Sequence, residues 1–297
     1  MKKVLLILMC CMAIQSVHAQ DTPKWADKAK KAVFSIVTYD KENKIKNTGN
    51  GFYIDNNGTA LSDYSLFEDA ERAVIINADG KELPVTRIAG ANSMYDVIKF
   101  RTETEKKITA LKVATQPAAV GETVYLLPYS TQKAATCQTG KVTQVDTIAD
   151  KAYYYTLTMT TSDKTVSCPI MNANGEVLGL IQKSASEEDK ESYAIGASYG
   201  ESLSISPLSA NDINLNKIGI AKALPETEDQ ALVYLYMSSS QMDAKNYLAT
   251  LNDFLQAYPN STEGYTRRAG YYMNIGDDEH NACLLYTSPS PRDVEES

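Results

Sequence analysis

The central part of this chain offers hydroxyl and thiol nucleophiles but no histidine to activate them. His18 and His280 are the only histidines, and each lies near an end of the chain. A serine or cysteine that attacks a carbonyl carbon needs a base to accept its proton, and imidazole most often has that role. Ser65, Ser167 and Cys168 have no imidazole partner between residues 19 and 279. The residue types therefore argue against catalysis by a serine–histidine or cysteine–histidine pair.

Neither a metal nor an organic cofactor is indicated by the sequence. The scattered carboxylates and the single histidine near the C-terminus lack the spacing of metal ligands. No glycine-rich phosphate-binding loop occurs. The net charge of −8 makes nucleic acid an unfavourable partner, and no apolar run is long enough to span a bilayer.

The elements that would position these side chains are short β-strands. Segments rich in β-branched and aromatic residues, which favour strands, occur at residues 32–39, 72–77, 97–100, 123–129, 141–145, 153–159 and 177–182. Asn-Gly or Asp-Gly pairs at residues 57–58, 79–80 and 174–175 tolerate the positive φ angles of tight hairpins. Many short strands with this punctuation predict an all-β barrel or sandwich.

Residues 49–67, GNGFYIDNNGTALSDYSLF, resemble the segment around the catalytic histidine of HtrA-type (Deg-type) trypsin-like serine peptidases. In that family a G-x-G-F-x-I-D strand leads to T-N-x-H-V. Ser65 stands in the histidine position. The resemblance continues in order through residues 78–85, 96–100, 139–142 and 169–180. It implies a chymotrypsin-like fold of two six-stranded antiparallel barrels, with Asp96 in the position of the triad aspartate.

The resemblance also implies that this site has lost its chemistry. The family carries its nucleophile in G-N-S-G-G-P, and alignment on Pro169 puts Val166 in the serine position and Lys164 in that of the oxyanion-loop glycine. Valine has no hydroxyl, and a lysine disfavours the tight turn that brings the oxyanion donors together. Ser65, Asp96 and Val166 are therefore expected to be a vestigial triad, with Asp96 bonded to backbone groups or to Ser65.

Two alternatives remain for the reactive side chains. A one-residue shift would make Ser167 the nucleophile, with Lys164 or Lys183 as its base. Cys137 and Cys168 fall on strands that the resemblance makes neighbours, so a disulfide between them is a candidate in an oxidising compartment. Two buried free thiols are the other outcome.

The C-terminal part changes to a helical pattern. Apolar residues recur at spacings of three and four over residues 229–258, and Pro259 ends the second of these helices. Residues 265–277 resemble the first helix of a tetratricopeptide (TPR) repeat. A helical hairpin at about residues 228–258 and a further helix from about 262 to 275 are therefore expected.

The N-terminus has the features of a secretory signal peptide. Lys2 and Lys3 precede an apolar run at residues 4–14, and a small-residue cleavage site ends at Ala19. This arrangement predicts export from a bacterial cell to the periplasm or the medium, with cleavage near Ala19.

The C-terminal tail matches a non-biological sequence. Residues 283–293, CLLYTSPSPRD, coincide with a reading frame of a sequencing adapter. We therefore expect residues 283–297 to lie outside the native protein. The predicted organisation is a signal peptide at 1–19, a degenerate trypsin-like peptidase domain at 25–205, a connector at 206–226, truncated TPR-like helices at 227–282, and the tail at 283–297.

Two functional hypotheses follow. The first is an exported inactive trypsin-fold protein that binds protein or peptide partners through its TPR helices and vestigial cleft. The second is an active serine-type endopeptidase with a non-standard nucleophile. The missing histidine favours the first.

Overall fold

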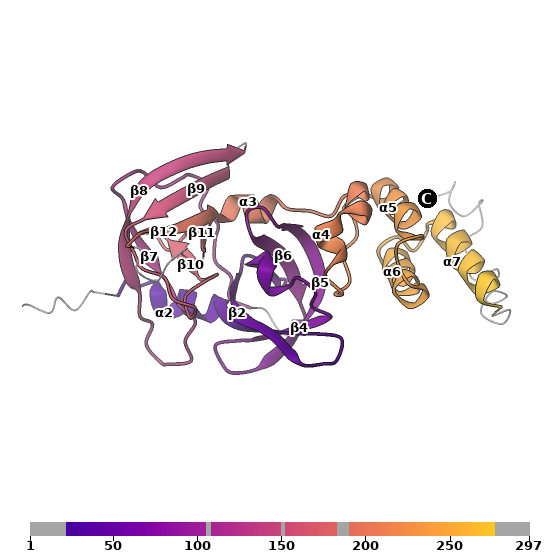
Figure 1. Ribbon diagram of the computed structural model, residues 1–297, viewed down its shortest axis with the longest axis horizontal. Coiled ribbons are helices and arrows are strands. Elements are labelled where there is room, and N and C mark those ends of the chain that lie inside the picture. The colour runs from indigo at the N-terminus through magenta and orange to yellow at the C-terminus, as the bar shows by residue number, and fades with distance from the viewer. Residues whose placement is uncertain (1–21, 105–107, 150–151, 183–189, 277–297) are drawn as a thin grey trace, which may run out of the picture.

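A computed structural model describes residues 22–104, 108–149, 152–182 and 190–276. Two β-barrels lie side by side, and three helices extend from the side of the first barrel (Figure 1). The predicted signal peptide at 1–19 and the tail at 283–297 lie outside the described residues, as do His18, His280 and Lys183. Within the described residues, no helix is both long enough and apolar enough to cross a membrane.

The first barrel is closed in the order β1-β2-β3-β6-β5-β4, with antiparallel pairing throughout. Its strands are β1 (Val33–Tyr39), β2 (Ile45–Tyr53), β3 (Thr59–Ser62), β4 (Arg72–Ile76), β5 (Glu82–Asn92) and β6 (Val97–Thr102). The 3-10 helix η2 (Tyr64–Leu66) follows β3. A short helix α2 (Ala26–Ala29) and the 3-10 helix η1 (Lys30–Ala32) precede β1.

The second barrel repeats the same strand order, β10-β11-β12-β9-β8-β7. Its strands are β7 (Thr123–Leu126), β8 (Gln138–Ala149), β9 (Ala152–Leu157), β10 (Pro169–Met171), β11 (Val177–Ile181) and β12 (Ser192–Gly196). Two closed six-stranded antiparallel barrels confirm the predicted chymotrypsin-like architecture. Closure leaves neither barrel with an open edge to pair with another chain.

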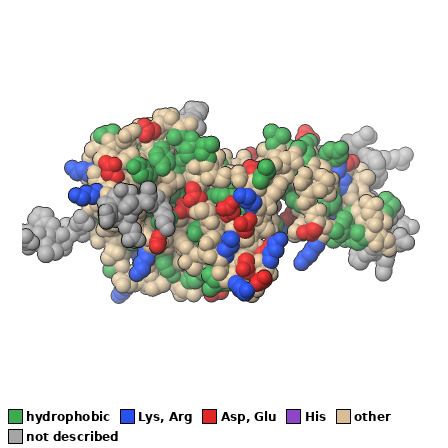
Figure 2. Space-filling model, in the orientation of Figure 1, with side chains coloured by type: hydrophobic (Ala, Val, Ile, Leu, Met, Phe, Trp, Pro, Cys, Tyr) green, Lys and Arg blue, Asp and Glu red, His purple; other side chains and the backbone are tan. Residues whose placement is uncertain are grey.

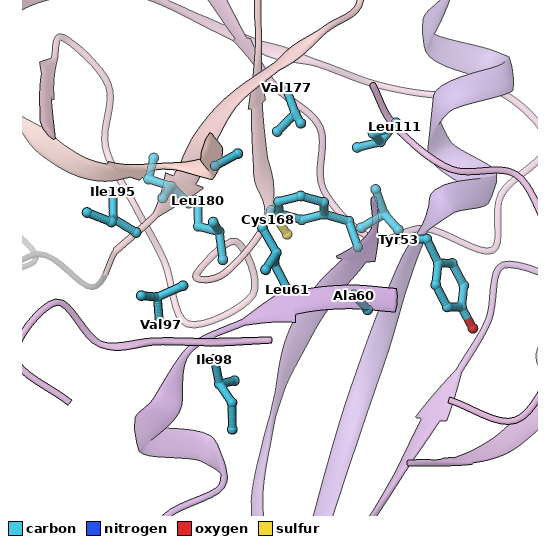
Figure 3. Packing of buried hydrophobic residues seen from close by; sticks show 14 of the residues in the cluster. Tyr53, Ala60, Leu61, Val97, Ile98, Leu111, Cys168, Val177, Leu180 and Ile195 are labelled. Atoms are coloured by element: carbon cyan, nitrogen blue, oxygen red, sulfur yellow. The ribbon is translucent and has the colours of Figure 1, made fainter. Parts of the chain in front are cut away.

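One hydrophobic cluster extends through both barrels and holds them together. Leu61 and Val97 of the first barrel belong to it, as do Cys168 and Leu180 of the second (Figure 3). Helix α3 (Ala197–Ser202) follows β12 and contacts elements of both barrels. A Cβ built on Gly200 of α3 would lie 2.9 Å from a methyl carbon of Leu61, so the absent side chain permits this close approach.

The connector at 206–226 is packed against the first barrel and includes two short helices, η3 (Pro207–Asn211) and α4 (Ile213–Asn216). Ile88 of β5 donates its N–H to Ala221 O at 2.8 Å and accepts the N–H of Ala223 at 2.7 Å. Beyond the connector, Asp253 pairs with Arg87 of β5. These contacts hold the connector and the helices beyond it against the first barrel.

Three helices follow: α5 (Glu228–Ser238), α6 (Ala244–Ala257) and α7 (Thr262–Ile275). Each begins after a residue whose side chain accepts a backbone N–H, namely Thr227, Asp243 and Ser261. Such caps satisfy one of the free donors at a helix start. The expected hairpin and third helix are present, while their assignment as TPR repeats stays a prediction. Acidic and basic side chains are interspersed over the first barrel, and hydrophobic ones occur among the helices (Figure 2).

Candidate functional site

Ser65 and Asp96 are bonded to each other on the first barrel. Ser65 lies in η2, and Asp96 directly precedes β6 with a left-handed φ of 47°. The Ser65 hydroxyl donates to Asp96 Oδ2 at 3.0 Å, and the Ser65 backbone N–H donates to Asp96 Oδ1 at 2.7 Å. The carboxylate therefore accepts both polar hydrogens of Ser65. The Ser65 hydroxyl cannot take a proton from a nucleophile and later return it, as the imidazole of a catalytic triad does.

The loop that precedes β10 is folded on itself. Ser162 O accepts the backbone N–H groups of Thr165 at 2.8 Å and of Val166 at 3.2 Å. In a working peptidase of this fold the N–H of the nucleophile residue points at the oxyanion. The N–H of Val166, which the sequence alignment places in that position, is bonded to Ser162 O. Lys164 is exposed, and Val166 is partly buried.

Asn50 of β2 joins this loop to the first barrel. Its side-chain amide donates to Lys164 O at 3.1 Å and to Val166 O at 2.9 Å. Its own backbone carbonyl accepts the Ser62 hydroxyl at 2.6 Å. Asn50 is only 6% exposed, so these bonds are shielded from water. A polar side chain of the first barrel is thus bonded to two carbonyl groups of the loop that precedes β10.

Replacing Asn50 with Ala is expected to destabilise the protein by about 2–3 kcal/mol. The change removes two hydrogen bonds and leaves two partly buried carbonyl groups without their donor. The measurement is the free energy of unfolding from urea titration. The matched control is Asn47→Ala, because Asn47 lies on the same strand and donates to backbone carbonyls on its own barrel. An Asn50 effect no larger than that of Asn47 would contradict the role of Asn50 as a link between barrels.

Asp63 forms a second, buried pair with Ser167 that the sequence analysis did not identify. Asp63 is 2% exposed and Ser167 is 0% exposed, and Asp63 Oδ1 and the Ser167 hydroxyl lack a well-formed hydrogen bond. Burial raises the pKa of Asp63 well above its usual range, the charge of Asp96 raises it further, and the nearby Ser167 hydroxyl lowers it. The sequence did contain one signal of this pair: Asp63 stands where the T-N-x-H-V pattern has asparagine.

Both thiols are free, and the candidate disulfide is not formed. Strand β7 lies between β8 and β10, so the segments carrying Cys137 and Cys168 are not neighbours as the sequence suggested. Two strand spacings are about 9–10 Å, beyond the Cα separation that a disulfide spans. Burial raises the pKa of Cys168 to about 12 and that of Cys137 to about 11, which keeps both thiols protonated and unreactive at neutral pH.

Only some of the residues that the sequence indicated are therefore in direct contact. Ser65 contacts Asp96 directly, while Lys164 and Val166 are connected to the first barrel through Asn50. The described residues contain no group of three His, Cys, Asp or Glu side chains placed to hold a metal ion.

Comparisons with known proteins agree with the fold of two barrels. Residues 49–180 match the family model of the trypsin-like peptidase domain. The crystal structure of the serine endoprotease from Yersinia pestis is similar, with a TM-score of 0.50 and 15% sequence identity. The similar region covers 59% of this chain and 61% of that chain. No curated protein matches.

The fold is thus that of the trypsin-like serine peptidases. Within this fold, the stretch that matches the trypsin-like peptidase domain model, residues 49–180, includes Ser65, Asp96 and Val166.

Proposed function

We propose that this chain is an exported, catalytically inactive trypsin-fold protein that binds protein or peptide partners. The observation that carries the proposal is the pairing of a serine hydroxyl, in place of an imidazole, with the carboxylate of Asp96. A hydroxyl does not accept a proton near neutral pH, so the carboxylate has no base to orient. The described part of the chain contains no histidine that could take over this task.

Two further features support inactivity. Val166 occupies the nucleophile position and supplies no oxygen to attack a carbonyl carbon. Its N–H is bonded to Ser162 O, so one oxyanion donor is unavailable without rearrangement of the loop. Loss of a single oxyanion donor lowers kcat by about 10²–10³. Base, nucleophile and oxyanion site are therefore each impaired for an independent reason.

The binding part of the proposal is supported by the exposed apolar residues of the helices. Val233 and Tyr236 of α5 are 48% and 67% exposed, and Met273 and Ile275 of α7 are 59% and 53% exposed. A contiguous exposed apolar patch is typical of surfaces that contact other proteins, and α5 and α7 each contribute two exposed apolar side chains. TPR-like helices are our assignment for this segment.

The alternative is an active endopeptidase that uses Ser167. The observation in its favour is the carboxyl of Asp63 beside that hydroxyl, because a carboxylate with a raised pKa can serve as a base. Against it, Ser167 is fully buried and its N–H is bonded to Ile181 O at 2.9 Å. A substrate carbonyl has no access to the hydroxyl without displacement of the loop. Lys164, the other candidate base, is exposed and forms no bond with Ser167.

The test is a fluorescently labelled unstructured protein, such as casein, incubated with residues 20–282. We expect its fluorescence anisotropy to rise without release of labelled fragments, because the chain binds extended segments but cannot cleave them. A fluorophosphonate probe is expected to leave the protein unlabelled. Ser65→Ala and Ser167→Ala are the matched controls for the two hydroxyls near the site.

Probe labelling that disappears in Ser167→Ala would establish the endopeptidase alternative. Labelling that disappears in Ser65→Ala would show that Ser65 is reactive and would equally overturn inactivity. Unchanged anisotropy would remove the binding half of the proposal and leave inactivity standing.

A further inference from the structure

Asp63 lies where the two barrels meet and is buried without a cation. It directly precedes η2 on the first barrel, and its carboxyl faces Ser167 of the second. No ion pair to Asp63 exists among the described residues. A carboxylate removed from water without a cation or hydrogen-bond donors is unstable, so the neutral acid is the form that this environment accepts.

The groups around Asp63 reinforce that preference. The carboxylate of Asp96, from the turn before β6, repels a second negative charge. The thiol of Cys168, from the segment before β10, is also held in its neutral form, partly by the charge that Asp63 would carry. The Ser167 hydroxyl is the one neighbour that favours the ionised carboxyl. As a neutral acid, Asp63 is able to donate its own proton to the Ser167 oxygen.

The backbone conformation of Ser167 connects the Asp63–Ser167 pair to the structure of loop 162–168. Ser167 has a φ of 64°, in the left-handed region that residues with a Cβ rarely adopt. Such a conformation persists where surrounding contacts hold it. Here the contacts are the bond of Ser167 N–H to Ile181 O and the bonds of Asn50 to the adjoining residues. A charge on Asp63 would therefore be buried directly beside a residue whose backbone conformation depends on its surroundings.

We propose that Asp63 is a proton-dependent lock between the two barrels. With its proton, the side chain fits against Ser167 and keeps loop 162–168 closed on the first barrel. Without the proton, the buried negative charge displaces the loop and exposes the vestigial cleft. The lock is independent of whether the cleft has any activity.

The direction of the pH dependence follows from proton linkage. The pKa of Asp63 is raised in the closed state, whereas an exposed aspartate has a pKa of about 3.9. Between these two values the closed state holds one proton more than the open state. The closed state is therefore favoured fully at low pH and loses its advantage as pH rises. The opening equilibrium constant increases about tenfold for each pH unit over that window.

The test is hydrogen exchange of the peptide covering residues 162–168, measured by mass spectrometry between pH 5 and pH 9 on the whole chain. Protection factors, which remove the intrinsic pH dependence of exchange, are expected to fall as pH rises in the unmodified protein, by up to about tenfold per pH unit until the pH passes the raised pKa of Asp63. Asp63→Asn keeps the shape and cannot ionise, so its protection is expected to be independent of pH. Asp79→Asn, which removes the same charge from an exposed turn, is expected to behave as the unmodified protein.

Two further variants should move the transition in opposite directions. Asp96→Asn removes the repelling charge, which lowers the pKa of Asp63 in the closed state, so the loss of protection is expected to end at a lower pH. Ser167→Gly removes the hydroxyl that favours the ionised carboxyl, suits the left-handed φ, and is expected to shift the loss to higher pH. These shifts keep the proposal testable if Asp63→Asn does not fold.

A fall in protection with pH that is as steep in Asp63→Asn as in the unmodified protein would overturn the lock. So would protection that does not change with pH in the unmodified protein. Shifts of the same sign in Asp96→Asn and Ser167→Gly would also count against it, because a purely structural loosening has no reason to distinguish the two.

Discussion

A chain carrying both Ser65→His and Val166→Ser is expected to remain without measurable peptidase activity. The double change restores a base beside Asp96 and a hydroxyl at the nucleophile position. It does not restore the oxyanion site, because the N–H of residue 166 is bonded to Ser162 O. Each single variant is expected to be inert as well, since triad residues act as a unit and their effects are far from additive. The measurements are peptide hydrolysis and fluorophosphonate labelling.

A matched variant separates the oxyanion site from the triad. Adding Lys164→Gly, Thr165→Asn, Ser167→Gly and Cys168→Gly to the double variant rebuilds the full G-N-S-G-G-P loop. Labelling is expected first in this variant, at least about 10²-fold above the double variant, which is the effect of one oxyanion donor. Circular dichroism checks that each variant keeps its β-sheet content. Strong labelling of the double variant alone would show that the loop already supports an oxyanion and would contradict our account.

The architecture was predictable because its strands carry local signals. Segments such as residues 72–77 and 97–100 combine β-branched residues with nearby turns, and they correspond to β4 and β6. Strand β3 was not identified from composition, because Thr59–Ser62 is short and contains few β-branched residues. Its place follows only from the closed order of the barrel. Local strand propensity thus indicated the fold class, whereas long-range pairing determined the order of the strands in each barrel.

The sequence predicted the candidate site only where a residue of this chain could be aligned with a catalytic position of the family. Matching placed Ser65 beside Asp96, and the structure brings the two side chains into contact. It gave no warning of the Asn50 link or of the Asp63–Ser167 pair, because both depend on which side chains meet across the barrels. The predicted neighbourhood of Cys137 and Cys168 was wrong for the same reason. Sequence order does not reveal that β7 separates their strands.

Gly179→Ala is expected to destabilise the second barrel strongly. Gly179 lies in β11 opposite Gly196 of β12, and a Cβ built on it would stand 2.4 Å from Ile195 O. That oxygen is backbone within a paired strand, so it cannot rotate aside as the end of a side chain can. Overpacking a well-packed core destabilises by about 1–3 kcal/mol, and we expect the upper part of that range.

The control is the same substitution where space is open. Gly270 lies inside α7, and nothing stands within 4 Å of a Cβ built there. Gly270→Ala is expected to stabilise the protein by about 0.5–1 kcal/mol, because alanine loses less backbone freedom in a helix. Urea titration of both variants compares a methyl group that must displace backbone with one that meets only solvent. Equal and small effects would mean that β11 and β12 separate readily at Gly179, and the close strand contact would then not be a source of the barrel's stability.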